Sequence, residues 1–234
     1  MSTVPTVIVF DVNETLSDLA PLTARFAEVG APATLAKLWF TALLRDGFAL
    51  AASGDSAPFG LIGADLLRGL LDEKAVEGEV KWMLDRSVDD AVTHVMAGLG
   101  ELSLHRDVVP GIRSLKTAGF RLLTLSNGPT KLADTMLSNA GLRNEFEALF
   151  TVEDAPVWKP ARSAYEHAAA ACGARLEDML LVAVHPWDIH GAARAGLQTA
   201  WLNRTGALYP SYFEAPDYTV SSLPELALRF RAAG

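Results

Sequence analysis

The sequence predicts an α/β fold, a Rossmann-like core built on a parallel sheet, with an all-helical cap subdomain inserted after the first strand. Two observations predict it. From about residue 120 to the end, short runs of apolar and β-branched residues alternate with segments of helical periodicity, a pattern typical of parallel βαβ units. Residues 19–100, by contrast, carry helical signals only, and they separate the first strand from the others.

The first strand is predicted over residues 6–11, TVIVFD, because a short continuous run of β-branched and aromatic residues is typical of a buried strand. The block that follows carries apolar residues at helical spacing. Residues 54–60, GDSAPFG, interrupt this pattern and are predicted as a loop. The helical stretches are residues 32–52, 59–73, 76–86 and 89–99.

Strands return in the second half of the chain, with helices between them. The predicted strands are residues 120–126, 146–154, 179–185 and 198–204, and the predicted helices are residues 127–141, 163–174 and 188–196. Residues 219–230, TVSSLPELALRF, indicate a final strand and helix. We therefore expect residues 1–18 and 101–234 to form the core and residues 19–100 to form the cap.

Composition narrows the function classes. The chain has 234 residues and a net charge of -8, so the basic surface that nucleic-acid binding requires is not expected. No apolar run is long enough to span a membrane, and no basic, apolar leader of a secretory signal is visible. The single cysteine, Cys172, excludes an internal disulfide and favours a reducing compartment. We expect a cytoplasmic protein.

Several polar residues fall where the predicted parallel strands end. Ligands of such sheets bind beyond the carboxyl ends of the strands, so these residues should meet at one edge. Each has an ordinary structural interpretation, such as capping a turn or a helix, or a solvated loop lysine. Together, next to an inserted cap, they indicate an active site; they are Asp11, Ser126, Lys159, His185 and Asp188.

The order of these residues resembles a known family. The segments FDVNETL, LLTLSNG, WKP and VAVHPWDIHGA resemble the four motifs of the haloacid dehalogenase (HAD) superfamily. The segments KPARSAYEHA, TAWLNRTG and PDYTVSSL are most similar to the type II 2-haloacid dehalogenases. The resemblance covers nearly the whole chain, and it implies a hydrolase with an aspartate nucleophile, a HAD core and a helical cap.

Two positions indicate which reaction of the superfamily applies. Its phosphatases carry a second aspartate two residues after the nucleophile, and a further motif-four carboxylate that binds magnesium. This chain has Asn13 and Val184 at these positions, which provide neither a general acid nor an anionic ligand for a hard cation. A halide departs as a stable anion and needs no proton. The sequence therefore favours attack on carbon, with no metal and no cofactor.

The resemblance also implies roles for individual residues. Asp11 attacks the carbon that bears the halogen, and the aspartyl ester is then hydrolysed. Lys159 keeps Asp11 ionised, since burial alone would raise its pKa. Thr15 and Ser126 hold the substrate carboxylate, Asn127 and Trp187 line the halide pocket, and Asp188 with His185 activates water. Tyr165 has a supporting role in the family, although it could also simply pack on a helix face.

Three positions depart from the family pattern. Phe40 follows Trp39 where the family has its halide-binding arginine; Arg45 could replace that arginine or remain solvated. Ala183 and His185 stand where the family usually has serine and asparagine. His185 could act as a general base, donate a hydrogen bond to a leaving fluoride or oxygen, or be structural. Asn13 replaces a common tyrosine and changes the shape of the pocket.

These observations lead to one predicted activity and three alternatives. We predict metal-independent, hydrolytic dehalogenation of a small anionic substrate, a 2-haloacid of the haloacetate or 2-halopropionate type, through an ester on Asp11. The first alternative opens a C–N or C–O ring in a small carboxylate. The others are a phosphatase and a non-catalytic binding protein. Family resemblance also suggests a possible homodimer.

Overall fold

The computed structural model describes residues 4–72, 82–155 and 157–231. Within these residues, one six-stranded sheet forms the centre of the molecule, with strand order β3-β2-β1-β4-β5-β6. Every adjacent pair of strands is parallel, which confirms the predicted α/β core. The strands are β1 (Val7–Phe10), β2 (Arg121–Ser126), β3 (Ala148–Thr151), β4 (Met179–Ala183), β5 (Gln198–Leu202) and β6 (Tyr218–Val220).

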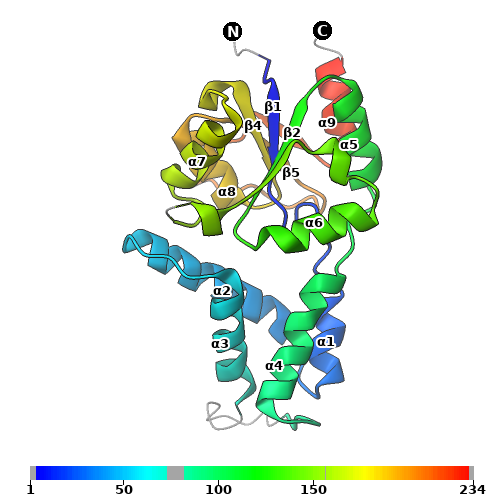
Figure 1. Cartoon of the computed structure of the whole chain (residues 1–234), viewed down its shortest axis with the longest axis vertical. Coiled ribbons are helices and arrows are strands. Elements are labelled where there is room, and N and C mark those ends of the chain that lie inside the picture. Colours follow the sequence, from blue (N-terminus) through cyan, green and yellow to red (C-terminus); the bar gives the residue numbers. More distant parts are fainter. Residues whose placement is uncertain (1–3, 73–81, 156, 232–234) are drawn as a thin grey trace.

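Both faces of the sheet are covered by helices, so the central strands consist of apolar residues in succession. Val7 and Val9 of β1 belong to one buried cluster, and Ile8 and Phe10 belong to a second cluster on the opposite face. This alternation is the two-residue period of a strand. The core helices are α5 (Val108–Thr117), α6 (Thr130–Asn139), α7 (Arg162–Cys172), α8 (Pro186–Ala195) and α9 (Leu223–Arg231), with α7 and α8 on one side and α5 and α9 on the other (Figure 1).

A second group of helices lies beyond the end of the sheet toward which β1 runs (Figure 1). These helices are α1 (Leu22–Glu28), α2 (Leu35–Ala52), α3 (Phe59–Leu71) and α4 (Val88–Ala97), and they pack against one another. The chain enters and leaves this group through two adjacent segments, joined by an antiparallel bridge between Ser17 and Leu104. The helical group therefore faces the carboxyl ends of the strands, where a cap is expected; its division at residues 19 and 100 stays a prediction.

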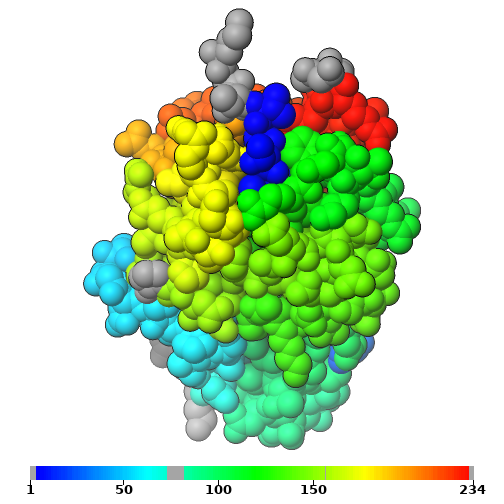
Figure 2. Space-filling model, turned by 45° about the horizontal axis from the view of Figure 1, so that its top comes forward, coloured from blue at the N-terminus to red at the C-terminus, as the bar shows by residue number. Residues whose placement is uncertain are grey.

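The helical group is packed onto the core at Trp158. Gly47 of α2 lies so close to the Trp158 ring that an added Cβ atom would be 2.4 Å from Cε3. The indole N–H of Trp158 donates to the Ala57 carbonyl at 3.1 Å, and its ring stacks on Phe59 at 6.1 Å. In the space-filling view the α2–α3 region lies directly against the core (Figure 2). Since Trp158 precedes Lys159, this contact joins the cap to one of the predicted catalytic residues.

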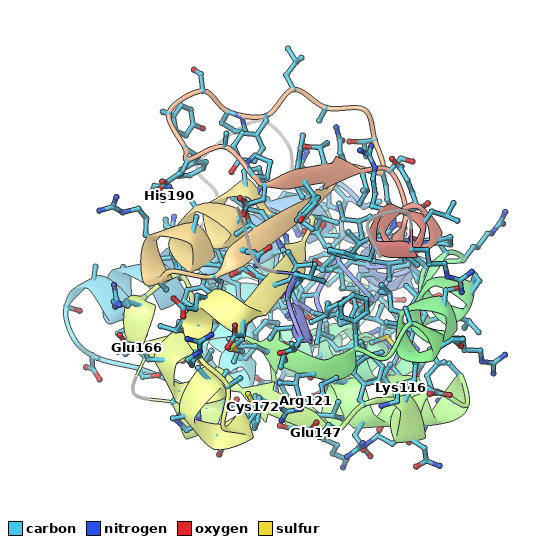
Figure 3. All side chains as sticks on the ribbon, turned by 90° about the horizontal axis from the view of Figure 1, so that it is seen from above. Lys116, Arg121, Glu147, Glu166, Cys172 and His190 are labelled. Atoms are coloured by element: carbon cyan, nitrogen blue, oxygen red, sulfur yellow. The ribbon has the colours of Figure 1, made fainter. Side chains whose placement is uncertain are left out.

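The opposite edge of the sheet carries surface contacts. Figure 3 looks onto this edge, where Arg121 forms an ion pair with Glu147 at 2.6 Å. Its guanidinium also donates to the backbone carbonyl of Cys172 at 2.7 Å. The Cys172 thiol, at the end of α7, is free and partly buried. The predicted catalytic residues all lie toward the other edge.

Some elements differ from the sequence prediction. Helices α1 and α5 were not predicted. Part of the predicted helix 76–86 lies outside the described residues, and residues 82–86 are not helical. Strand β3 is also shorter than predicted, because a 3₁₀ turn (Val152–Asp154) begins directly after Thr151. None of the helices in the described residues has both the length and the apolar character needed to cross a lipid bilayer.

Candidate active site

Asp11 directly follows β1, and its side chain is held from several directions. Its backbone N–H still donates to Val182 of the neighbouring strand β4, at 3.0 Å. The chain then turns, and the Thr15 hydroxyl donates to Asp11 Oδ2 at 2.6 Å. The same hydroxyl accepts the Val184 backbone N–H at 3.1 Å. With 3% of its surface exposed, the Asp11 carboxylate is fixed at the edge of the sheet.

Lys159 is fully buried between two carboxylates. Its Nζ lies 3.0 Å from Asp11 Oδ1 and 2.7 Å from Asp188 Oδ2. The backbone of Lys159 is held on both sides by the Asn127 side chain, with hydrogen bonds of 3.0 and 3.2 Å. Asn127 thus positions Lys159, whereas the sequence comparison had placed its amide in the halide pocket.

Asp188 lies in the first turn of α8 and completes a buried charge cluster. One of its oxygens accepts from Lys159, and the other accepts the Tyr165 hydroxyl at 2.5 Å. Tyr165 comes from α7, which packs against α8. Gly191 allows this approach, because a Cβ atom there would lie 2.7 Å from the Tyr165 hydroxyl. Tyr165 therefore contacts a predicted catalytic residue directly.

The pKa values of these groups follow from burial and charge. Burial would raise the pKa of Asp11, but Lys159 and hydrogen bonds from His185 and Thr15 outweigh burial and hold it well below its usual range. Burial would lower the pKa of Lys159, yet the two carboxylates raise it. The pKa of Asp188 is raised, mainly by burial and also by the charge of Asp11. At neutral pH Asp11 is an ionised carboxylate paired with a lysine cation.

His185 lies on the other side of Asp11. Its Nδ1 is 3.2 Å from Asp11 Oδ2, and its Nε2 is 2.8 Å from Glu14 Oε2. Burial alone would lower the pKa of His185, but the hydrogen bonds and charges of these two carboxylates raise it to about 9. The structure brings His185 to Asp11 and not to Asp188, next to which a general base was expected.

Glu14 is a site residue that sequence reasoning missed. Its backbone has a φ of 60°, a conformation that side chains other than glycine, asparagine and aspartate adopt rarely. The turn that imposes it cannot be inferred from spacing alone, and a glutamate in NET looks like an ordinary surface residue. The signal that could have found it is His185, a histidine at a predicted site position whose second ring nitrogen needs a hydrogen-bond partner.

Aromatic side chains form the wall beside His185. The Trp187 ring stacks on His185 at 5.0 Å and meets Phe48 of α2 edge-on at 4.8 Å. Phe40, where the family pattern has arginine, is buried with its ring 6.4 Å from His185. Arg45, the other candidate for the role of that arginine, has a side chain that is 68% exposed and paired with Asp46.

A cavity of about 1040 Å³ lies between the helical group and the core. His185, Trp187 and Glu14 line it on the core side, and Phe40 and Arg45 line it from α2. Its size is at the upper end of the range for pockets that hold drug-sized ligands, about 300–1,000 Å³. Asp11 does not line the cavity; His185, which contacts Asp11, lies between the cavity and the nucleophile.

Ser126 and Asn13 lie on a third side of the site. Ser126 ends β2 with 2% of its surface exposed, and its hydroxyl accepts the Gly128 N–H at 2.9 Å. The Asn13 amide lies next to Gly128, where an added Cβ atom would be 3.3 Å from Asn13 Nδ2. Among the described residues, no group of three or more histidine, cysteine, aspartate or glutamate side chains is arranged to hold a metal ion.

The family of the chain follows from comparison with known proteins. A model of haloacid dehalogenase-like hydrolases matches residues 5–196, so the chain belongs to this family. The haloacetate dehalogenase H-2 of Moraxella sp. (strain B) is 39% identical over 114 residues, which are 49% of this chain and 51% of that protein. An (S)-2-haloacid dehalogenase of Pseudomonas putida is 28% identical over 227 residues, 94% of each chain.

A solved structure of an L-2-haloacid dehalogenase has a TM-score of 0.86 and 25% identity, and it covers 98% of this chain and 100% of that one. The alignments to the more similar curated relatives are shorter, and in these the chain spans about half of the relative's length. The predicted resemblance to type II 2-haloacid dehalogenases is confirmed by these relatives.

Proposed function

We propose that this chain hydrolyses the carbon–halogen bond of a small 2-haloacid through a covalent ester on Asp11. The observation that carries the proposal is the state of Asp11: a buried carboxylate, kept ionised by Lys159, at the edge of the sheet where ligands bind. The names of the related proteins support the same chemistry, since they are haloacetate and 2-haloacid dehalogenases.

In the first step, an Asp11 oxygen attacks the carbon that bears the halogen, and halide leaves with the bonding electron pair. Ser126, Asn13 and backbone N–H groups after β2 hold the substrate carboxylate in this proposal. Thr15, to which the resemblance also assigned that carboxylate, instead holds Asp11 and the Val184 backbone. Trp187 and Phe40 provide the apolar wall of the halide pocket. Asn13 has no proton to donate as an acid, which suits a leaving group that departs as a stable anion.

In the second step, water attacks the Asp11 carboxyl carbon and releases the hydroxyacid. Asp188 is the base for this water, because its raised pKa makes it a better proton acceptor than an ordinary aspartate. Tyr165 orients Asp188 through its 2.5 Å hydrogen bond. Lys159 stabilises negative charge that develops on Asp11 Oδ1.

Residues 19–100 act as a cap in this proposal and exclude water from the carboxylate during the first step. The contact of Gly47 with Trp158 supports this role. A small anionic substrate, a cytoplasmic location and a possible homodimer are part of the same proposal, and nucleic acid is not a partner. This mechanism requires no metal, since Lys159 balances the negative charge of the Asp11 carboxylate.

The ring-opening alternative is less favoured by the geometry. A displacement in line with the attacking oxygen sends the leaving group to the far side of the carbon. A nitrogen or oxygen leaving group would need a proton donor there. The N–H groups of His185 instead point at Asp11 and Glu14, on the side of the nucleophile.

The test is halide release from fluoroacetate, chloroacetate and both enantiomers of 2-chloropropionate in the presence of EDTA. We expect release by the wild-type chain and none by Asp11→Asn. Asp55→Asn is the matched control, because Asp55 lies in an exposed loop of the cap. Release that requires added magnesium, or that persists in Asp11→Asn, would contradict the proposal.

A further inference from the structure

Glu14, His185 and Asp11 form a continuous chain of charged side chains from the cavity to the nucleophile. Glu14 is 45% exposed and lies at the cavity end, and His185 is 12% exposed between the two carboxylates. Each imidazole nitrogen faces a carboxylate oxygen, at 3.2 and 2.8 Å. An imidazole can donate from both nitrogens only when it is protonated, so this arrangement holds a cation.

The surroundings also favour the cation. The imidazole ring stacks on Trp187 at 5.0 Å, and an aromatic face attracts positive charge. Glu14 adopts its left-handed backbone conformation with two contacts that hold the turn. Its N–H donates to Ser17 Oγ, and its carbonyl faces His105 Nε2 at 3.0 Å. The chain therefore accepts an unfavourable backbone geometry to place a carboxylate against His185.

The first chemical step has no use for this proton, because halide leaves as an anion on the far side of the carbon. The second step needs one. When water attacks the ester, the oxygen that leaves with the hydroxyacid would depart as a strongly basic alkoxide. Oδ2 is the Asp11 oxygen nearest to His185, which lines the cavity, whereas Oδ1 faces the fully buried Lys159. Because Oδ1 is paired with Lys159, we take Oδ2, which also accepts the Thr15 hydroxyl at 2.6 Å, as the oxygen that attacks the substrate.

We propose that His185 is the general acid that protonates Oδ2 as the ester breaks, and that Glu14 is a positioning residue that keeps His185 protonated and aimed. This inference rests on the ester mechanism proposed above. It adds a reaction step for His185 and a residue, Glu14, that the sequence had not indicated.

The steps balance in atoms and charge. Formation of the ester joins Oδ2 to the substrate carbon and releases halide. Water then bonds to the Asp11 carboxyl carbon and gives one proton to Asp188. The bond from that carbon to Oδ2 breaks, and Oδ2 takes the His185 Nδ1 proton and leaves as the hydroxyl of the product. The new Asp11 carboxylic acid returns its remaining proton to His185, and Asp188 releases the other to solvent.

Other charged groups surround this chain and contribute to its titration. Asp11 and Glu14 contact His185 directly, and Lys159 and Asp188 lie behind Asp11. The remaining titratable groups near it are His105 against the Glu14 carbonyl and, on the cavity wall, Asp18, Lys37 and Arg45 of α2, and Arg204. None of these residues is changed in the variants below.

The experiment uses His185→Gln with saturating chloroacetate, so that weaker binding of the anionic substrate does not limit the burst, and measures chloride and intact protein mass in one turnover. We expect a burst of about one chloride per chain, and a protein that carries a carboxymethyl group and loses it roughly 100-fold more slowly than the wild type. His190→Gln is the matched control. His190 lies in α8, the helix that His185 precedes, and is next to the loop after β5 (Figure 3). It should not accumulate the ester.

Glu14→Gln tests the positioning role through pH. In the wild type the hydrolysis rate of the ester should fall as pH rises, at a pH below the value of about 9 that holds for His185 in the free enzyme, because esterification removes the Asp11 charge that helps to raise that pKa. Without Glu14 the fall should move to lower pH, and Glu14→Asp should restore it in part. The exposed Glu14 side chain makes these variants informative even if His185→Gln does not fold.

Three results would overturn the inference. These are chloride release by folded His185→Gln without ester accumulation, loss of the chloride burst itself in that variant, and an unchanged pH profile in Glu14→Gln. A failure of the underlying ester mechanism gives a different result: neither the wild type nor His185→Gln would release chloride or carry the ester.

Discussion

Replacement of Lys159 by methionine should damage both catalysis and stability, because one buried cation serves two buried carboxylates. Methionine is similar in length but carries no charge. In Lys159→Met, Asp11 and Asp188 would remain buried without the ammonium group that lies 3.0 and 2.7 Å from their oxygens. Breaking a buried ion pair by removing one partner costs about 3–5 kcal/mol. For a chain of this size that corresponds to a fall in Tm of roughly 6–20 °C at neutral pH.

The effect should depend on pH with a definite sign. In the wild type, the low pKa of Asp11 contributes stability above the pKa of an unfolded aspartate, about 3.9, and this contribution is lost as pH falls through the folded pKa. In Lys159→Met the pKa values of both aspartates should instead lie above that of the unfolded chain. The folded variant then binds more protons than the unfolded one, so the stability gap to wild type should narrow from pH 7.5 to pH 5.

Thermal unfolding at both pH values and halide release at pH 7.5 measure these effects. Lys131→Met is the matched control, since Lys131 is exposed on α6. We expect Lys159→Met to lose at least about 100-fold in rate, as for removal of one charge-stabilising donor. A folded variant with near-normal activity would refute the role of Lys159. A Tm deficit that is the same at pH 5 and pH 7.5 would refute the electrostatic explanation of its stability.

Three further predictions concern the support of the site and the cavity. Tyr165→Phe should keep the fold and slow ester hydrolysis about 10-fold or more, since a hydrogen bond to a charged group contributes about 1.5–3 kcal/mol; a normal rate would contradict its role. Gly47→Ala should lower Tm by roughly 2–12 °C through overpacking against Trp158, whereas Gly69→Ala, whose new Cβ meets nothing within 4 Å, should not. 2-Chlorohexanoate should have about 5-fold or more lower kcat/KM than chloroacetate, because Asp11 is only 3% exposed and does not line the cavity, so a longer chain must displace packed side chains at a cost of about 1–3 kcal/mol; an equal or higher kcat/KM for 2-chlorohexanoate would contradict the small-substrate proposal.

The core of the fold could be predicted from sequence because local pattern determines it. Continuous apolar, β-branched runs such as the one in residues 6–11 indicate strands that are buried on both faces. The alternation of such strands with helices then indicates a parallel sheet. Helix α5 was missed because PGIRSLK has few apolar residues, although they fall on one face that packs on α9. Helix α1 was missed because it is only seven residues long, which is too short to show a clear helical period.

The site was predictable to the extent that strand ends define it. Asp11, Lys159 and Asp188 were predicted to lie together because each follows the carboxyl end of a parallel strand, and the ion pairs of Lys159 with both aspartates agree with this. The partners of Asn127 and His185 depend on loop conformations, which the sequence does not encode in a regular period. An amide that could bind halide instead holds the Lys159 backbone, and a histidine expected beside Asp188 is held by Glu14.

The charges of the site explain why His185 matters for an anionic substrate. Asp11 and Asp188 are balanced by Lys159 and by protonated His185, so the buried cluster has no net charge. A substrate carboxylate adds one negative charge to a region of low dielectric, where repulsion from an unbalanced aspartate would be strong. Where the family pattern has an arginine, this chain has Phe40, and the positive charge beside the nucleophile comes from His185. The same imidazolium that neutralises the site for substrate entry is then in place to donate its proton when the ester breaks.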